Sequence, residues 1–319
     1  MIRRNFVLAS LAAYTVVPAR ANQQVIGWVS PENPETVKPF YDAFMAGLHA
    51  LPGGNQVQVL DRYVLGGGAE QYAAVVNELQ QKDVALIIAQ GAATPGVVRA
   101  NPTVPVVFAY SGDPVVGKIV ESLARPGGKA TGVTFMSVEL NPKRIDFVRT
   151  ALPKARKIGL LSNVNHFGEE NEIAACQTAV QQAGVELTVY RVSALPEIQP
   201  AVVRALDDGI EVLVVLPSAG MVRYSPEIIR QCLARKVPVV SGWSSFAHAG
   251  ALLTYGPNLG EGMKRVAWYT MRVLDGTRPS DLPVEKPTRL ELVLNRKTAA
   301  QLGIDLPLVL LAQAEEIIE

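Results

Sequence analysis

Residues 84–109 read VALIIAQGAATPGVVRANPTVPVVFA, and this stretch decides the fold. Two apolar runs, 84–89 and 104–109, enclose a loop of small residues and a segment in which Pro95 can begin a helix. Apolar runs without polar alternation are typical of strands that are buried on both faces, as in parallel sheets. The stretch therefore predicts two parallel strands that are joined through a helix.

The same alternation of short apolar runs and longer amphipathic segments extends in both directions. Further strands are expected at 25–29, 56–60, 131–135, 157–161, 185–190, 212–216, 238–240, 251–255 and 290–294. Helices are expected at 35–50, 69–81, 141–151, 169–183, 225–234 and 259–274. The dipeptide Asn141-Pro142 is a typical helix start. Because the series restarts after the turn-rich stretch 124–132, we predict an α/β fold with two doubly wound parallel-sheet lobes.

The last part of the chain, residues 251–319, has too few expected elements for a core of its own. These elements must therefore complete the two lobes, so the chain crosses between the lobes more than once. Several crossing segments together form a hinge, about which two rigid lobes can close on a cleft.

The composition excludes several classes of protein. The 319 residues carry a formal charge of +1 without a basic stripe, which argues against nucleic-acid binding. With 49% hydrophobic residues and no low-complexity tract, the chain is not disordered. The three histidines are scattered and the two cysteines are far apart, so we expect no metal site, no cofactor and no disulfide-rich scaffold.

Residues 1–21 are typical of an export signal. Arg3 and Arg4 precede a mostly apolar stretch, and Ala19-Arg20-Ala21 offers the small residues of a cleavage site. The paired arginines also resemble a twin-arginine signal, so the twin-arginine and general export routes both stay open. A buried N-terminal helix is the alternative.

Cleavage after Ala21 would remove three arginines and no acid, which changes the formal charge from +1 to −2. The apolar core of the segment 1–21 is too short to span a membrane as a helix, and no other apolar stretch is long enough either. We therefore expect a periplasmic monomer without stable membrane insertion.

Five stretches carry a likeness to a known family. They are Pro105–Phe108 with Gly112-Asp113-Pro114, Leu123–Gly128 with Thr131-Gly132, Gly250–Gly256, Leu282–Glu285, and Glu291–Asn295 with Lys297-Thr298-Ala299. They resemble the ABC-transporter substrate-binding family of the tryptophan/tyrosine type. The likeness covers residues 104–319, whereas the N-terminal part is similar mainly in plan.

This resemblance implies the fold of the type I periplasmic solute-binding proteins. Lobe one would comprise residues 22–133 plus 256–278, and lobe two would comprise residues 134–255 plus 279–319. The resemblance also implies extracytoplasmic capture of a small solute and its delivery to an ABC permease and ATPase complex. The first candidate solute is an aromatic or hydrophobic amino acid or a related carboxylate.

The candidate binding residues follow the expected strands, because ligands in open parallel sheets bind beyond the carboxyl ends of the strands. In lobe one they are Ser30, Gly91, Ala92, Ala93, Thr94, Tyr110, Ser111 and Asp113. In lobe two they are Asn163, Phe167, Ser218 and Trp243, and the crossing segments add Phe135 and Tyr255. For the last two residues, packing within the hinge is the alternative role.

The loop 91–95 is the strongest of these candidates. Its small residues let backbone N–H groups approach a ligand closely, and Thr94 is expected to cap the helix that Pro95 begins. A ligand carboxylate would accept hydrogen bonds from the amides at this positive helix end. An ordinary capped turn is the alternative.

Lobe two supplies polar and aromatic groups. Asn163 and Ser218 can form hydrogen bonds with an ammonium or hydroxyl group, and Phe167 or Trp243 can stack on an aromatic solute. Packing at the hinge or at the rim of the cleft is the alternative for each aromatic side chain.

Two other functions stay open at this point. An exported α/β hydrolase would use His248 and a serine, although a Gly-x-Ser-x-Gly nucleophile elbow is absent from the sequence. A periplasmic sensory module would need a fused transducer or anchor.

Cys176 and Cys232 are expected on helices that cover opposite faces of the lobe-two sheet, given right-handed crossovers and the strand order 2-1-3-4. Their Cα atoms would then lie farther apart than the ~7 Å that a disulfide allows. We therefore predict two free, buried thiols.

Overall fold

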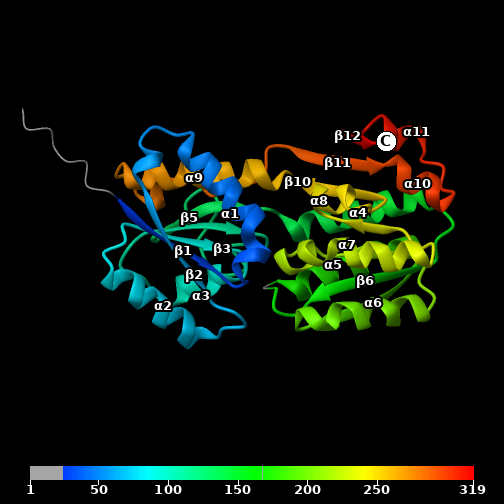
Figure 1. The fold of residues 1–319 in the computed structure, drawn as a ribbon, viewed down its shortest axis with the longest axis horizontal. Coiled ribbons are helices and arrows are strands. Elements are labelled where there is room, and N and C mark those ends of the chain that lie inside the picture. Colours follow the sequence, from blue (N-terminus) through cyan, green and yellow to red (C-terminus); the bar gives the residue numbers. More distant parts are fainter. Residues whose placement is uncertain (1–23, 167) are drawn as a thin grey trace, which may run out of the picture.

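The computed structural model describes residues 24–166 and 168–319. The expected export signal, residues 1–21, lies outside the described residues. Figure 1 shows two lobes side by side, each built on a sheet. The first sheet has the strand order β2-β1-β3-β4-β5, and the second has the order β12-β11-β10-β9-β8-β6-β7.

The first sheet is parallel throughout. Its strands are β1 (Val25–Ser30), β2 (Gln58–Tyr63), β3 (Ile87–Gln90), β4 (Val106–Tyr110) and β5 (Ala130–Thr134). Its helices are α1 (Pro34–His49), α2 (Ala69–Gln81), α3 (Ala93–Arg99) and α9 (Leu259–Leu274). Helices α1 and α9 pack together over one face, and α2 and α3 cover the other. We call this sheet with its helices the first lobe.

The second sheet is mixed, because β11 runs antiparallel to β10. Its strands are β6 (Lys157–Asn163), β7 (Glu186–Val192), β8 (Val212–Val215), β9 (Val239–Ser241), β10 (Leu253–Pro257), β11 (Leu290–Asn295) and β12 (Glu316–Ile318). Its helices are α4 (Ser137–Ala151), α5 (Glu169–Ala183), α6 (Ile198–Asp207), α7 (Ala219–Ala234), α8 (Ser244–His248), α10 (Arg296–Leu302) and α11 (Leu308–Leu311). The run β7-β6-β8-β9 confirms the strand order 2-1-3-4. We call this sheet with its helices the second lobe.

The central strands are buried on both faces, as the apolar runs predicted. In β8, Val212 and Val214 belong to one core cluster, whereas Leu213 and Val215 belong to the cluster on the opposite face. Such strands need apolar residues at every position, and this accounts for the low charged fraction of 18%.

Three segments cross between the lobes: one follows β5, one follows β10, and one joins α9 to β11. The first and the third lie side by side. Val133 forms a parallel bridge with Glu285, and the Thr134 N–H donates to the Glu285 carbonyl over 2.9 Å. The second crossing segment leads from β10 back to the first lobe, where Figure 1 shows α9, in orange, beside the blue and cyan elements.

Helices α4 and α7 begin earlier than the sequence predicted. Helix α4 begins at Ser137 rather than at residue 141, and α7 begins at Ala219 rather than at residue 225, so each contains a proline in its interior. In α7 the Ser225 hydroxyl donates to the Val222 carbonyl over 2.8 Å. That carbonyl would otherwise lack a partner, because a proline at position 226 has no N–H to donate. For α4, the expected start at Asn141-Pro142 was therefore wrong.

Both thiols are free and buried, which confirms the prediction for the cysteines. Cys176 lies in the core cluster on one face of the second sheet, and Cys232 lies in the cluster on the other face. The expected placement on opposite faces is correct.

Candidate functional site

A cavity of about 440 Å³ lies between the two lobes. Segments that directly follow strands β1 to β9 contribute to its lining, and helices α1 and α2 add single side chains. The cavity thus occupies the edge where the carboxyl ends of both sheets meet, and its volume is typical of a small-molecule site.

The structure brings seven of the sequence candidates together around this cavity. They are Gly91, Ala92, Ser111, Phe135, Asn163, Ser218 and Trp243. Six others, Ser30, Ala93, Thr94, Tyr110, Asp113 and Tyr255, are not part of the lining. Phe167 lies outside the described residues.

Thr94 does not cap a helix, so this prediction was wrong. Helix α3 begins at Ala93 after Ala92, and Thr94 is its second residue. The buried Thr94 hydroxyl donates instead to the Ala89 carbonyl over 3.1 Å. The Thr94 side chain therefore stabilises the turn from β3 into α3 from within the core of the lobe.

Ser30 does not line the cavity but contacts Gln90, a residue that does. It is fully buried, and its hydroxyl donates to Gln90 Oε1 over 3.1 Å. Gln90 reaches the cavity at the end of β3. Ser30 thus orients a polar side chain that the sequence did not single out.

Four candidates outside the lining remain. Ala93 is the first residue of α3 and is fully buried in the core, and the other three also have structural roles. Asp113 accepts hydrogen bonds from the N–H groups of Val115 and Val116, over 2.8 and 3.2 Å. The Tyr255 ring packs edge-on against Phe147, with 4.9 Å between the centroids. Tyr110 is almost completely buried, which raises the pKa of its hydroxyl.

Four aromatic side chains form walls of the cavity: Phe40, Tyr72, Phe135 and Trp243. Phe40 of the first lobe meets Trp243 of the second edge-on, with 5.6 Å between the ring centroids. Phe40 and Tyr72 escaped sequence reasoning because their helical spacing is the same as that of core residues such as Phe44. Only their position near the start of a helix distinguishes them.

The lining holds two side chains that readily carry a charge, Glu32 after β1 and His166 after β6. Burial raises the pKa of Glu32. For His166, burial lowers the pKa, but the Glu172 carboxylate 2.9 Å from its Nε2 outweighs burial, and the pKa is raised. Burial raises the pKa of Tyr72 to about 12, so its hydroxyl stays neutral.

Arg223 of α7 reaches across the cleft to the first lobe. Its Nη2 lies 2.7 Å from Glu35 Oε2, and its Nη1 donates to Asn33 Oδ1 and Thr36 Oγ1 over 3.2 and 3.3 Å. These contacts join the start of α1 to the second lobe, so the structure shows the lobes closed on the cavity.

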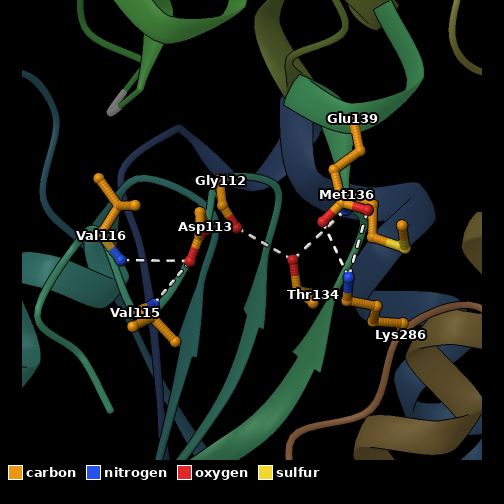
Figure 2. Close-up of polar contacts among 8 residues, drawn as sticks. All are labelled: Gly112, Asp113, Val115, Val116, Thr134, Met136, Glu139 and Lys286. Atoms are coloured by element: carbon orange, nitrogen blue, oxygen red, sulfur yellow. Dashed lines mark hydrogen bonds and ion pairs between the residues drawn. The ribbon is translucent and has the colours of Figure 1, made fainter. Parts of the chain in front are cut away.

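A second cavity, of about 430 Å³, lies on the other face of the first crossing segment. Phe135 lines the cavity described above, whereas its neighbours Thr134 and Met136 line this second one. Figure 2 shows the polar contacts here: the Thr134 hydroxyl donates to the Gly112 carbonyl over 3.0 Å, and Lys286 pairs with Glu139.

Within the described part of the chain, no serine hydroxyl forms a hydrogen bond with His248. Its Nδ1 contacts the Ser244 carbonyl at 2.8 Å, and its Nε2 contacts Glu316 at 2.9 Å. Both ring nitrogens are thus engaged away from the cavity, which speaks against the hydrolase alternative. The described part of the chain also has no group of three or more His, Cys, Asp or Glu residues that could hold a metal ion.

Among the described residues, no helix has both the length and the apolar content for crossing a membrane.

Comparisons with known proteins agree with this architecture. The tyrosine-binding protein of Clostridioides difficile (strain R20291) is 24% identical over 207 residues, which are 65% of this chain. The match spans 59% of the length of that relative. A domain from Streptococcus pneumoniae, solved in complex with L-Trp, superimposes with a TM-score of 0.82 at 20% identity, over 93% of this chain and all of that one.

A ligand-free, open substrate binding protein from Clostridium difficile has a TM-score of 0.63 at 18% identity, over 92% of this chain and 99% of that one. These structures confirm the two-lobed fold of the type I periplasmic binding proteins. Residues 44–318 match the family model of the ABC transporter substrate binding proteins. The match confirms the resemblance seen in the sequence, and the chain belongs to this family.

Proposed function

We propose that the protein captures an aromatic or hydrophobic amino acid, or a related carboxylate, between its lobes and delivers it to an ABC permease. The observation that carries the proposal is the interlobe cavity with its four aromatic walls. Aromatic rings supply large apolar contact areas and favour a flat, apolar ligand group.

The relatives support this ligand class. One is named a tyrosine-binding protein, and another was solved with L-Trp. The family to which the chain belongs consists of substrate-binding proteins. Extracytoplasmic location, export through the segment 1–21 and handover to a permease and ATPase complex are part of the proposal.

The proposed contacts divide into two groups. Phe135 and Trp243 would hold the apolar part of the ligand, whereas Ser111, Asn163 and Ser218 would bind its polar groups. Gly91 and Ala92 lie at the end of β3, where small side chains let a ligand approach the backbone closely. Closure of the lobes around the ligand would stabilise the form that a permease recognises.

The first experiment is a thermal-shift screen of amino acids and aromatic carboxylates, followed by titration calorimetry. A ligand at ~100 times its Kd should add ~2.7 kcal/mol to the free energy of unfolding. We expect Trp243→Ala to weaken binding at least about tenfold, because the ring forms one wall of the cavity. The absence of a shift with all these compounds at saturating concentration would show that the ligand class is wrong.

Trp268→Ala is the matched control. Trp268 lies on α9 with the Arg265 guanidinium 3.6 Å from its ring centroid, and it does not line the cavity. Binding should be unchanged in this variant. An equal loss in both variants would mean that the effect comes from instability and not from a lost ligand contact.

A further inference from the structure

The charged side chains that line the interlobe cavity indicate which charges the ligand carries. The lining contains one carboxylate, Glu32, and one imidazole, His166, and none of its residues is a lysine or an arginine. Glu32 follows β1 of the first lobe, whereas His166 follows β6 of the second. Opposite charges are thus offered from the two sides of the cleft.

Glu32 lacks a cationic partner among the described residues. It takes part in no ion pair, and its backbone N–H, not its carboxylate, contacts Ser30. Arg223, the second-lobe cation that reaches this part of the first lobe, is bound to Glu35, Asn33 and Thr36. A half-buried carboxylate without a partner is unfavourable, and a cationic ligand group would relieve this cost.

His166 is held so that one nitrogen stays available. Its Nε2 lies 2.9 Å from Glu172 Oε1, and its backbone N–H donates to the Asn163 carbonyl over 2.9 Å. Its Nδ1 has no partner among the described residues. Because the ring belongs to the lining, Nδ1 is the atom that it can offer to a ligand.

Glu172 is suited to keep that imidazole charged. It is fully buried on α5 and also accepts a hydrogen bond from Asn141 Nδ2 over 3.4 Å. Arg144 is the other cation of this buried group, and it contacts Asn141 and the Tyr255 carbonyl. With Nε2–H directed to the carboxylate, a protonated ring presents Nδ1–H as a donor to an anion.

We propose that the ligand is a zwitterion whose ammonium group binds Glu32 and whose carboxylate binds His166. This inference rests on the proposed function and makes the solute an α-amino acid rather than a simple carboxylate. Each lobe binds one charge, so only a ligand with both charges bridges the lobes. Recognition and closure are thereby linked, because a ligand stabilises the closed form only through contacts that the open form lacks.

The test uses the full chain and three probes that share one ring system: L-tryptophan, tryptamine without the carboxylate, and indole-3-propionate without the ammonium group. We expect L-tryptophan to bind at least about tenfold more tightly than either analogue. Glu32→Gln should weaken L-tryptophan binding by about 10- to 100-fold and leave indole-3-propionate unaffected. His166→Gln should weaken L-tryptophan binding similarly and leave tryptamine unaffected, and this retained binding shows that the variant folds.

Matched controls are Glu261→Gln and His248→Gln. Glu261 pairs with Lys264 on the exposed surface of α9, and His248 pairs with Glu316, so neither lines the cavity. Both variants should bind all three probes as the unchanged protein does.

The outcomes separate the two proposals. Tight L-tryptophan binding that survives both Glu32→Gln and His166→Gln would overturn the assignment of the anchors and leave the proposed function intact. Binding of indole-3-propionate as tight as that of L-tryptophan would overturn the zwitterion. If L-tryptophan, L-tyrosine, L-phenylalanine, L-leucine and the two analogues all fail to bind the unchanged protein, the ligand class of the proposed function is wrong.

Discussion

Arg223→Ala should weaken ligand binding without loss of folding stability, because Arg223 acts across the cleft. Its ion pair with Glu35 spans 2.7 Å, but the side chains are 38% and 78% exposed, so the pair is worth only about 0.2–1 kcal/mol. The hydrogen bonds to Asn33 and Thr36 raise the total to about 1–2 kcal/mol. At 1.4 kcal/mol per tenfold change, the Kd should rise about 5- to 30-fold.

The assay is calorimetric titration with L-tryptophan at low and at high salt. Salt should weaken binding to the unchanged protein more than binding to Arg223→Ala, because only the former contains the exposed ion pair. Glu35→Ala should reproduce only the ion-pair share of the loss. The melting temperature of the ligand-free variant should stay unchanged, since these contacts form between lobes and not within one.

Arg235→Ala is the matched control for this experiment. Its guanidinium pairs with Asp207 over 2.8 Å at similar exposure, but both residues belong to the second lobe. The Kd should not change in this variant. An unchanged Kd in Arg223→Ala, or an equal loss in Arg235→Ala, would refute the view that Arg223 stabilises the closed form.

Three further predictions concern stability and reactivity. Gly256→Ala should lower the free energy of unfolding by about 1–3 kcal/mol in urea titration, because the added Cβ would overlap the backbone carbonyl oxygen of Gly242. Gly128→Ala is the control and should be neutral, because the space around Gly128 is open. Equal effects of the two substitutions would contradict this reasoning. The folded protein raises the pKa of His166 above 6.5, since its buried carboxylate partner outweighs the opposing effect of burial. The resulting stabilisation of the folded protein should be complete below pH 6.5 and disappear as the pH rises through the raised pKa of His166. If the free energy of unfolding has the same pH dependence in His166→Gln, the prediction is wrong. Burial raises the pKa of Cys176 and Cys232 to about 12. A thiol reagent should therefore label neither cysteine in the folded protein and both cysteines after denaturation without reductant. Labelling of the folded protein would contradict the burial of the two thiols.

The sequence predicted the fold well where two independent signals agreed. Helices α2, α5 and α9 have the expected bounds, because amphipathic spacing and the flanking turn residues mark the same ends. Helices α4 and α7 were misplaced at their first turns. In both, a proline that suits a helix start lies in the helix interior, where tertiary packing overrides local preference.

The candidate site was predictable only in part, and the reason is geometric. Residues that directly follow a strand, such as Gly91, Ser111 and Trp243, could be placed because the carboxyl ends of parallel strands meet at one edge. Whether such a residue faces the cavity or the core depends on the conformation of the turn. The turn after β3 directs the Thr94 hydroxyl to the Ala89 carbonyl in the core and not into the cavity. Side chains that enter from helices, such as Phe40, carry no signal that separates a cavity wall from a core contact.

The two thiols on opposite faces of the second sheet have a consequence for how this protein is made. The chain contains only these two cysteines, and neither needs to be oxidised in the folded structure. Its thiols therefore stay unpaired in a reducing and in an oxidising compartment alike, and folding requires no thiol oxidant and no disulfide isomerase. A bond between Cys176 and Cys232 would require the sheet that separates them to come apart, so oxidation would trap unfolded chains only.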